Sequence, residues 1–347
     1  MADFIDYSSN LQTATILIAI CVSGITTLVL AKPIMQKMRE RGITGVDWNK
    51  RDRTEIPELG GIALLFGFPI GISIATGVLK LFDTLIATPI LAAIGVVFIA
   101  GMIGMLDDIS DIPQRIKAIV VSFAALPLIL SGSGNQIIDI PFFSPLDFSI
   151  NHGMSLIFWL IIVPLGITGA ANAMNMSAGY NGLETGQVAI ISLALMSACI
   201  LAPGGNIESI MIFAAIAGAA IGLNYYNGYP AITFIGDVGT LSMGAVIGAG
   251  TIIGGIEFAG LIAFLPAFYE VFSTAYYSFI KKVNRKEACA RPIIDDQNRL
   301  HCPKGAEKYT LAYWILSKKP MTERNLVRTI LSIYLVFGVL AVIISIV

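Results

Sequence analysis

The sequence predicts an all-α, polytopic membrane protein with about ten transmembrane helices. Its 347 residues are 56% hydrophobic and only 13% charged, whereas about 25% of the residues of an average soluble domain are charged. Apolar runs long enough to cross a bilayer recur from one end of the chain to the other. Because these runs extend to the last residues, we expect one integral membrane domain over residues 1–347, with a basic loop at 281–326 within it.

Ten apolar runs are expected as helices, and in chain order they cover residues 11–31, 59–79, 89–106, 116–131, 155–171, 186–203, 207–224, 239–256, 258–280 and 327–347. A membrane span needs roughly 17–25 residues, so the fourth and fifth runs are short. The first run follows an acidic start with Asp3 and Asp6, which favours a retained helix over a signal peptide. The four cysteines are scattered, and their spacing indicates neither a disulfide framework nor a zinc site.

The distribution of basic residues predicts the orientation in the membrane. Segments 32–58, 107–117 and 281–328 hold seven, two and twelve of the 22 lysines and arginines, which leaves only Lys80 elsewhere. With ten spans these three segments lie on one side, and the positive-inside rule makes that side cytoplasmic. Both termini are then expected outside, while the loops at 172–186 and 225–238 also face the cytoplasm.

The predicted outer face has few residues that could bind or react with a substrate. Its longest loop, 132–154, contains Asp139, Asp147 and His152 but no lysine or arginine, and His152 is more typical of a solvated loop residue than of a ligand. The polar side chains are therefore concentrated on the cytoplasmic face. This arrangement suits a water-soluble substrate that arrives from the cytoplasm.

The segment 171–186 is the most unusual stretch of the chain. It places three asparagines, one glutamate and three glycines between two apolar runs. Amides and carboxylates at a membrane border are costly unless they are solvated, paired or bound to a ligand. The glycines permit a left-handed or closely approaching backbone, which a site for a phosphate-bearing ligand often needs. The alternative is a plain helix-to-helix turn with polar capping.

Neighbouring carboxylates stand at the end of the third apolar run, at Asp107, Asp108 and Asp111. Like-charge repulsion and partial desolvation strain such a group unless a cation or a basic ligand lies nearby, and such groups cluster at functional sites. The alternative is a solvated helix border at which Arg115 and Lys117 are local partners.

Asp237 is the only charged residue in its loop, and glycines and apolar residues flank it. It is either a solvent-facing turn residue or a ligand for a hard cation. Magnesium takes one or two oxygen ligands from protein, while phosphates and water complete its coordination. An asparagine, an aspartate and a diphosphate would satisfy that requirement.

Together these segments resemble the polyprenyl-phosphate N-acetylhexosamine-1-phosphate transferases (glycosyltransferase family 4), and most of all the branch that transfers GlcNAc-1-phosphate to dolichyl phosphate. The matching residues are, in chain order, Gly45-x-Asp47-x-Asn49-Lys50 with Ile56-Pro57-Glu58, Asp107-Asp108 with Lys117, Asn172-x-x-Asn175-x-x-x-Gly179-x-Asn181-Gly182-Leu183-Glu184, Gly236-Asp237, and His301-Cys302-Pro303. Each motif is weak alone, but five in a consistent order between residues 30 and 304 are specific. The bacterial peptidoglycan enzymes more often carry an aspartate where Ala178 stands.

The resemblance implies a Mg²⁺-dependent transfer, with Mn²⁺ as an alternative cation. A lipid phosphate attacks the β-phosphorus of a UDP-sugar and gives a polyprenyl-diphospho-sugar and UMP. The resemblance assigns Mg²⁺ to Asn175 and Asp237, the diphosphate to Lys117, and orientation or deprotonation of the lipid phosphate to Asp107 and Asp108. The implied substrate-binding residues are Asn181, which would contact uracil, and Gly182, Asp47, Asn49, Glu58, His301 and Lys304. This division agrees with phosphoryl transfer as a matter of positioning and charge neutralisation.

The last loop departs from the family pattern. In this branch Cys-Pro is usually followed by Arg-His-Arg, which grips the phosphates and the amino sugar, but here Lys304, Gly305 and Ala306 follow. Lys304 keeps a charge without the planar fork of arginine, and Lys308 or Arg299 are candidates to compensate. The identity of the sugar is therefore open.

Two alternatives to the dolichyl-type enzyme remain. One is a bacterial-type enzyme that makes undecaprenyl-linked amino sugars, and the other is a transporter of lipid-linked sugars, although transporters place polar groups on broken helices at mid-membrane. For the enzyme, the expected partners are a UDP-sugar, a polyprenyl phosphate and the membrane, with a homodimer left open and no nucleic acid. The expected location is the cell membrane, with a cytoplasmic active site at the first membrane step of glycan assembly.

Overall fold

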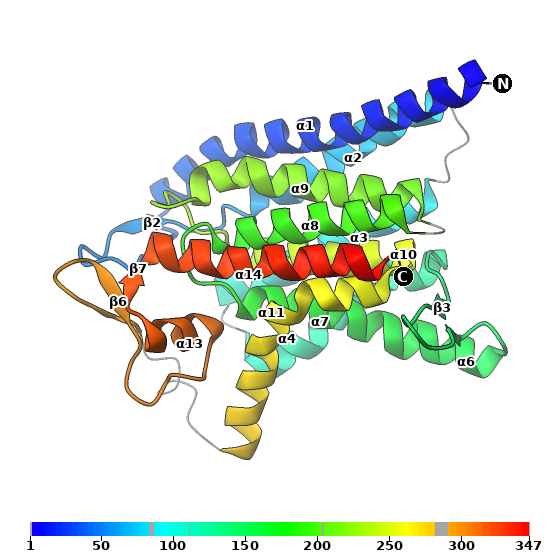
Figure 1. Ribbon diagram of the computed structural model, residues 1–347. Helices are drawn as coiled ribbons and strands as arrows, with labels where there is room; N and C mark the ends of the chain where they lie inside the picture. Colours follow the sequence, from blue (N-terminus) through cyan, green and yellow to red (C-terminus); the bar gives the residue numbers. More distant parts are fainter. Residues whose placement is uncertain (1, 83–86, 111, 203–204, 282–290, 347) are drawn as a thin grey trace.

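The computed structural model describes residues 2–82, 87–110, 112–202, 205–281 and 291–346 as a bundle of roughly parallel helices (Figure 1). In these residues nine helical segments are long and apolar enough to span a membrane. They are α1 (Ala2–Glu40), α2 (Ile62–Phe82), α3 (Thr88–Ser110), α6 (His152–Ile157) continued by a π-helical turn (Phe158–Ile162) into α7 (Val163–Met176), α8 (Leu183–Leu201), α9 (Ile207–Asn227), α10 (Gly236–Gly254), α11 (Glu257–Ala275) and α14 (Glu323–Ile344). The chain is an all-α polytopic membrane protein, as predicted.

The fourth predicted helix, at 116–131, is present but shorter than a typical span. It consists of α4 (Gln114–Val120), a 3₁₀ segment (Val121–Ala125) and α5 (Leu126–Ser131). The predicted and observed boundaries differ most at the first run, because α1 continues to Glu40 and carries Lys37 and Arg39 in its last turn. The helix therefore extends beyond its apolar residues at the end that bears the basic segments.

The connecting segments contain structure that the hydrophobic pattern did not predict. An antiparallel pair joins β1 (Thr44–Val46) to β2 (Glu55–Pro57), and a second pair joins β3 (Ile137–Ile138) to β4 (Leu146–Asp147). The last loop forms a three-stranded sheet and a short helix, with β5 (Ile293–Ile294), β6 (Arg299–His301), β7 (Met321–Thr322) and α13 (Leu311–Lys318). These elements are too short to leave a periodic apolar signal.

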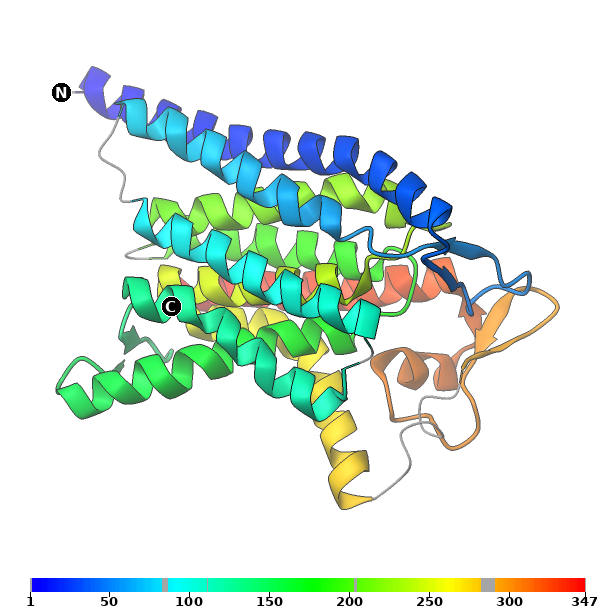
Figure 2. The same cartoon turned by 180° about the vertical axis from the view of Figure 1, so that it is seen from behind.

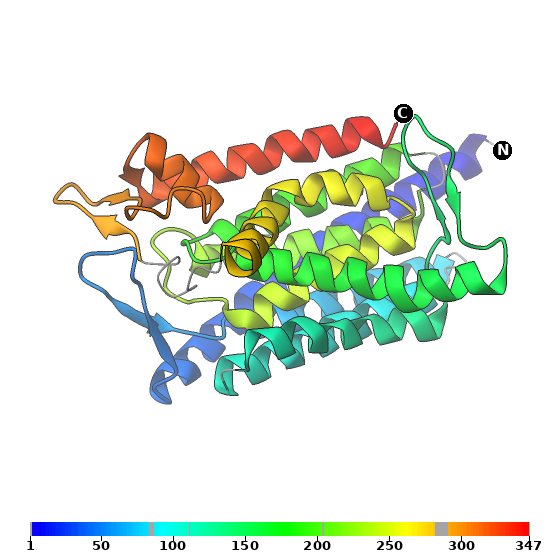
Figure 3. The same ribbon diagram turned by 90° about the horizontal axis from the view of Figure 1, so that it is seen from below.

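The two ends of the bundle differ. Both termini lie at one end together with β3 and β4, whereas β2, β6, β7 and α13 lie at the other (Figures 1 and 3). The first and last basic segments thus share one end, as predicted from their charge. Which compartment that end faces stays a prediction.

Helix α10 lies at the centre of the bundle. All of its residues from Val238 to Gly254 are buried, and it packs against α3, α7 and α9, as the rear view shows for α3 (Figure 2). Its first turn, with Asp237, reaches the end that carries the basic segments. The most deeply buried of the described membrane-spanning helices therefore presents its N-terminus to the candidate site.

Helix α11 changes direction near that same end. It contains Pro266 and continues into a π-helical segment at Tyr276–Ile280, which turns away from the bundle in Figures 1 and 2. Proline inside a helix removes a hydrogen bond and is a usual cause of a kink. Glu270 and Ser273 follow the proline and remain buried, which places both beside the last loop.

Candidate active site

Asp108 caps the N-terminus of α10. Its two carboxylate oxygens accept hydrogen bonds from the backbone N–H groups of Asp237, at 2.8 Å, and Val238, at 3.0 Å. An anion at this position satisfies backbone donors that have no partner within the helix and interacts favourably with the helix dipole. The end of α3 thereby holds the first turn of α10, and with it the side chain of Asp237.

Lys117 connects the aspartate pair to α10. Its ammonium group contacts Asp107 Oδ2 at 2.6 Å and also forms an ion pair with Asp237 Oδ2. The lysine is 7% exposed, and a buried cation of this kind is stable only when opposite charges compensate it. Asp107 therefore orients Lys117, a role distinct from that of Asp108.

Asn175 lies directly beside Asp237. Its amide nitrogen donates to Asp237 Oδ1 at 2.6 Å and to Thr240 Oγ1 at 2.9 Å. The two residues predicted as metal ligands are thus adjacent, although 62 positions separate them in the chain. A half-turn of the amide would present its oxygen to the same point as the carboxylate.

Glu58 adds a fourth carboxylate to this group. Burial, followed by the charge of Asp237, raises the pKa of Glu58 above its ordinary value. Among the described side chains, Lys117 is the cation that pairs with Asp107 and Asp237. In the described part of the chain no three His, Cys, Asp or Glu residues form a metal cluster. A cation here would depend on Asp237, Asn175 and ligand oxygens, which fits the preference of magnesium.

Helix α3 approaches α10 closely at Gly104. A Cβ atom at this glycine would collide with the backbone carbonyl of Asp237 and with the backbone nitrogen of Val238. The absence of a side chain at Gly104 allows the end of α3 to lie against the first turn of α10. The position of Asp237 is therefore set by backbone packing as well as by the Asp108 cap.

The polar stretch at 171–186 forms a turn whose backbone is held from two sides. Glu184 Oε1 accepts the N–H of Gly179 at 2.7 Å, and the carbonyl of Gly179 accepts a hydrogen bond from Asn49 Nδ2 at 2.8 Å. Gly179 has a φ of +127°, a conformation that favours glycine. The expectation of an unusual backbone is confirmed at Gly179 and at Gly182, whose φ is +79°, whereas Gly186 lies within α8.

Asn181 is the centre of a buried hydrogen-bond network. Its side-chain nitrogen donates to Asp47 Oδ2 at 3.1 Å and to Glu323 Oε1 at 3.0 Å. Its oxygen accepts from Lys50 Nζ at 2.8 Å and from the backbone N–H of Ala231 at 2.7 Å. Because protein partners already engage both polar atoms, contact of this side chain with uracil stays a prediction and would require one of these bonds to change.

Glu323 was not predicted as a site residue. It is 3% exposed, and its Oε1 also accepts from the Asn181 N–H at 2.9 Å and from Asn49 Nδ2 at 3.3 Å. One sequence signal was available, because Glu323 is the acidic residue of the first turn of the last helix. That signal indicates only a helix N-terminus, so it does not identify the network.

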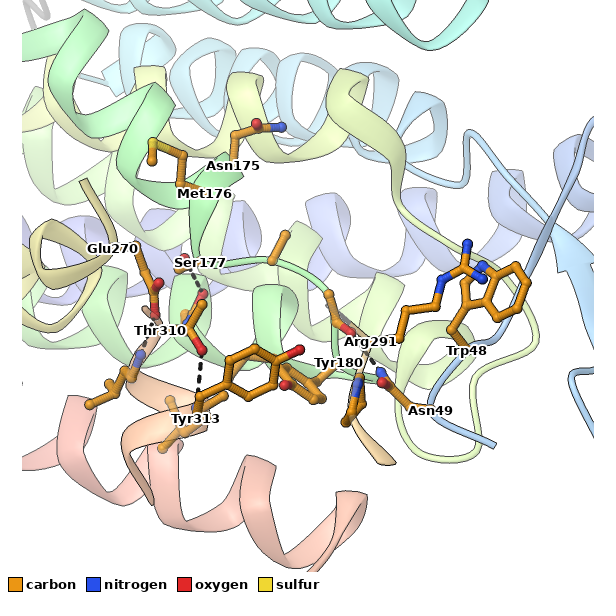
Figure 4. Close-up of a pocket in the computed structure, with 18 of the residues that line it drawn as sticks. Trp48, Asn49, Asn175, Met176, Ser177, Tyr180, Glu270, Arg291, Thr310 and Tyr313 are labelled. Atoms are coloured by element: carbon orange, nitrogen blue, oxygen red, sulfur yellow. Dashed lines mark hydrogen bonds between the residues drawn. The ribbon is translucent and has the colours of Figure 1, made fainter. Parts of the chain in front are cut away.

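A cavity of about 470 Å³ opens beside these groups. Figure 4 shows Glu270 on one side of it, Trp48 and Arg291 on the opposite side, and Asn175 set back between them. A smaller cavity of about 220 Å³, which Asp237 and Thr240 help to line, shares the segment 178–180 with it. The large cavity is lined by Val46, Asp47, Trp48, Asn49, Asn175, Met176, Ser177, Ala178, Gly179, Tyr180, Leu183, Gln187, Phe234, Pro266, Glu270, Arg291, Pro292, Thr310, Leu311, Ala312, Tyr313, Ile330 and Tyr334.

Of the residues predicted to bind substrate, Asp47 and Asn49 line this cavity and Asn181 lines the smaller one, whereas Glu58, Gly182, His301 and Lys304 line neither. His301 Nε2 contacts Asp295 Oδ2 at 2.9 Å, and hydrogen bonds from His301 and Arg299 hold the pKa of the Asp295 carboxyl well below its usual range. Lys304 is exposed. Contact of His301 or Lys304 with the donor stays a prediction, and Asp111 lies outside the described residues.

Side chains of the first and last loops join above the cavity. The Arg291 guanidinium lies over the ring of Trp48, and Arg51 contacts Asp296 at 2.9 Å. Arg51 and Asp296 are exposed, so this ion pair contributes little. The stacked pair and the Glu323 network are the firmer connections between the loops.

Comparisons with known proteins agree with this arrangement. The family model described as glycosyl transferase family 4 matches residues 90–255, which include Asp107, Lys117, Asn175 and Asp237. A Sulfolobus acidocaldarius protein, provisionally named a UDP-N-acetylglucosamine–dolichyl-phosphate N-acetylglucosaminephosphotransferase, is 31% identical over 94% of this chain and 95% of its own length. A Saccharolobus solfataricus protein of the same provisional name is 31% identical over 95% of each. A Bacillus subtilis protein, provisionally named an undecaprenyl-phosphate N-acetylglucosaminyl 1-phosphate transferase, is 24% identical over 82% of this chain and 76% of its own.

Proposed function

This chain belongs to glycosyl transferase family 4, and we propose that it transfers a HexNAc-1-phosphate from a UDP-sugar to a polyprenyl phosphate, giving a polyprenyl-diphospho-sugar and UMP. GlcNAc-1-phosphate and dolichyl phosphate are the first candidates, because the Sulfolobus acidocaldarius and Saccharolobus solfataricus relatives are named for them. An undecaprenyl-type acceptor is the second candidate, because the Bacillus subtilis relative is named for it.

Four residues of the chain meet at one end of the bundle, and this observation carries the proposal. They are Asp107, Lys117, Asn175 and Asp237. Phosphoryl transfer needs few covalent partners from the protein, but it needs groups that position and neutralise phosphate oxygens. These residues stand on four separate helices, beside a cavity within the usual size range for ligand pockets. The same end of the bundle carries the basic segments, as an anionic donor requires.

Different residues of the chain have different roles in the proposed transfer. Lys117, turned toward Asp237 by Asp107, donates to the diphosphate of the donor and leaves its ion pair as it does so. Asp108 holds the first turn of α10 and acts through the position of Asp237. The turn at Gly179, fixed by Glu184 and Asn49, presents backbone to the cavity. Because the phosphate monoester of the lipid is ionised near neutral pH, it needs orientation more than deprotonation.

Asp237 and Asn175 would hold Mg²⁺, with Mn²⁺ as a substitute. The bound cation would neutralise charge on the diphosphate and polarise the phosphorus–oxygen bond that breaks. Support comes from the carboxylates that lie close to Asp237 and from the adjacency of Asn175. We expect EDTA to abolish turnover and added Mg²⁺ to restore it. Full activity in EDTA would remove the cation from the proposal.

The active site is proposed to face the cytoplasm from the cell membrane. Support comes from the basic residues gathered at that end of the bundle and from the solubility of UDP-sugars in the cytoplasm. This orientation is tested with a thiol reagent that does not cross the membrane. The reagent is applied to proteins with a single cysteine at residue 42 or at residue 150, in a background without other cysteines. Protection of residue 42 in intact cells, with labelling of residue 150, is expected, and the reverse would overturn the assignment.

Release of UMP tests the proposed reaction. We expect purified protein with Mg²⁺, a polyprenyl phosphate and a panel of UDP-HexNAc donors to release UMP with at least one donor, and only when the lipid is present. The competing class is a transporter of lipid-linked sugars. Movement of such a lipid across vesicles, with no UMP from any donor, would favour the transporter.

A further inference from the structure

The residues that match the family's usual sugar-recognition triplet do not line the cavity. Lys304 and Gly305 are exposed, and Ala306 is buried but apolar. None of these three residues contributes to the wall of the 470 Å³ cavity. Another group must therefore recognise the sugar in this chain, if the proposed transfer is correct.

Glu270 is the carboxylate at the end of the cavity that lies away from Trp48 and Arg291 (Figure 4). It is only 6% exposed. Its Oε1 accepts the backbone N–H of Leu311 at 2.8 Å, which supplies one of the roughly four hydrogen bonds that a carboxylate can accept. A buried carboxylate with spare acceptor capacity is costly unless a ligand completes its hydrogen bonds.

The layout of the cavity places the Glu270 carboxyl group where the sugar of a bound donor is expected. In a UDP-sugar the diphosphate joins the nucleoside to the sugar. If the diphosphate lies beside Asn175, the nucleoside and the sugar therefore lie on opposite sides of that residue. The Trp48 end carries Asn49, whose side chain donates to the Gly179 carbonyl and to Glu323. Glu323 also accepts from Asn181, the residue that the family resemblance assigns to uracil, so we assign this end to the nucleoside. The Glu270 end, lined also by Thr310 and Tyr313, is then left for the sugar.

We propose that Glu270 is a specificity-determining residue that accepts hydrogen bonds from the hydroxyl or amide N–H groups of a neutral N-acetylhexosamine. This inference rests on the proposed function and names the class of its donor. A sugar that carries its own carboxylate is rejected, because its charge would be buried beside the Glu270 carboxyl group while Arg291, the cationic residue in the cavity lining, lies at the opposite end. UDP-linked N-acetylhexosaminuronic acids are therefore excluded.

A purely structural role for Glu270 has to be separated from recognition, because the same residue anchors the start of α13. Ser273, one turn further along α11, provides the matched control. Its hydroxyl donates to the carbonyls of Lys308, at 2.8 Å, and Tyr309, at 2.9 Å, and it does not line the cavity. Ser273→Ala weakens the anchoring of the loop without changing the cavity wall.

The test compares Glu270→Gln, Ser273→Ala and the unaltered protein in UMP release with UDP-GlcNAc, UDP-GalNAc and UDP-N-acetylglucosaminuronic acid, together with inhibition by UDP. Glu270→Gln keeps an oxygen for Leu311 but places a donor where an acceptor stood. We expect the unaltered protein to prefer its better neutral donor over the uronate by at least about 100-fold in kcat/KM, since polar groups left unpaired discriminate strongly. Glu270→Gln should reduce that preference by at least about tenfold and leave the inhibition constant of UDP within about twofold.

Two results would overturn the role of Glu270. One is an unchanged preference in Glu270→Gln, and the other is a matching change of preference in Ser273→Ala. If the unaltered protein binds the donors but releases no UMP, the proposed function fails. Glu270 can then still be tested by calorimetry, which gives the ratio of the binding constants for neutral and acidic donors. A ratio near one in the unaltered protein would reject the inference on binding alone.

Discussion

The site combines two regions that are built differently. The helix-borne cluster, defined as Asp107, Lys117, Asn175 and Asp237, stands on the ends of packed helices and is held by backbone contacts and buried ion pairs. The loop-borne wall, defined as Trp48, Asn49, Arg291 and Thr310, belongs to the first and last loops and is held by side-chain contacts.

The difference indicates how such an enzyme can change its donor while it keeps its chemistry. Groups that handle phosphate must be placed to within a fraction of an ångström, which rigid helix ends provide. Groups that recognise the sugar can move to another segment without disturbing them. The departure at Lys304–Ala306 lies in the loop, whereas the four residues of the helix-borne cluster all match the family pattern.

The largest effect is expected in the helix-borne cluster. Asp237→Ala removes one of the two partners of Lys117 and of Asn175 and should lower kcat by about 10³-fold, a loss typical of removing a preorganised charge. UMP release and gel filtration of the same preparation provide the measurement. Asp139→Ala, at the opposite end of the bundle, should leave both unchanged. Turnover near the original level in folded Asp237→Ala protein would take Asp237 out of the reaction.

A second substitution tests whether backbone packing positions this cluster. Gly104→Ala introduces a methyl group against the carbonyl of Asp237 and should separate α3 from the first turn of α10. Because small misplacements can cost about 10²-fold, we expect kcat to fall by about that factor while the KM for the donor changes little. Gly77→Ala, where a Cβ meets open space in another membrane helix, is the control. A rise in KM alone would show that Gly104 affects binding instead.

The connection between the regions should give an intermediate effect. Glu323→Ala removes the acceptor of three hydrogen bonds from Asn49 and Asn181. A lost hydrogen bond to a charged group costs about 1.5–3 kcal/mol, so we expect the donor KM to rise about tenfold while kcat changes less. Glu323→Gln retains an accepting oxygen and should lie close to the unaltered protein. Equal losses in the two variants would mean that the charge, and not the network, matters.

The smallest effect is expected at the surface of the loop-borne wall. Arg51 and Asp296 pair across the two loops, but their side chains are 51% and 96% exposed. Such pairs contribute about 0–1 kcal/mol, so Arg51→Ala should change kcat/KM by no more than about fivefold. Steady-state kinetics at low and high salt are the measurement. A fall comparable to that of Glu323→Ala would show that this pair holds the loops.

The sequence predicted the helix-borne region well because each of its signals is local. Apolar runs marked the helices, and Asp107, Lys117, Asn175 and Asp237 stood out as polar residues at their ends. The separate duties of Asp108, a helix cap, and Asp107, a partner of Lys117, could not be predicted, because adjacent carboxylates look alike until the backbone donors beside them are known.

The loop-borne region was predicted poorly because its contacts connect distant positions. Glu323 lies 142 residues from Asn181, and no local pattern relates them. Glu270 belongs to helix α11 and was missed for a different reason, because it occupies an apolar run whose hydrophobic pattern indicates a helix but no cavity. The small sheets and α13 were missed because elements of two to eight residues carry no period that can be recognised.

In the proposed reaction the sugar and its β-phosphate move together to the lipid. This joint transfer is tested most directly with UDP-GlcNAc that carries ³²P in the β-phosphate and ³H in the uridine, incubated with the protein, Mg²⁺ and dolichyl phosphate. We predict ³²P in the extracted lipid and ³H in water as UMP, in equal amounts. A lipid that gains the sugar without ³²P, or ³²P that remains in water with the uridine, would contradict this joint transfer.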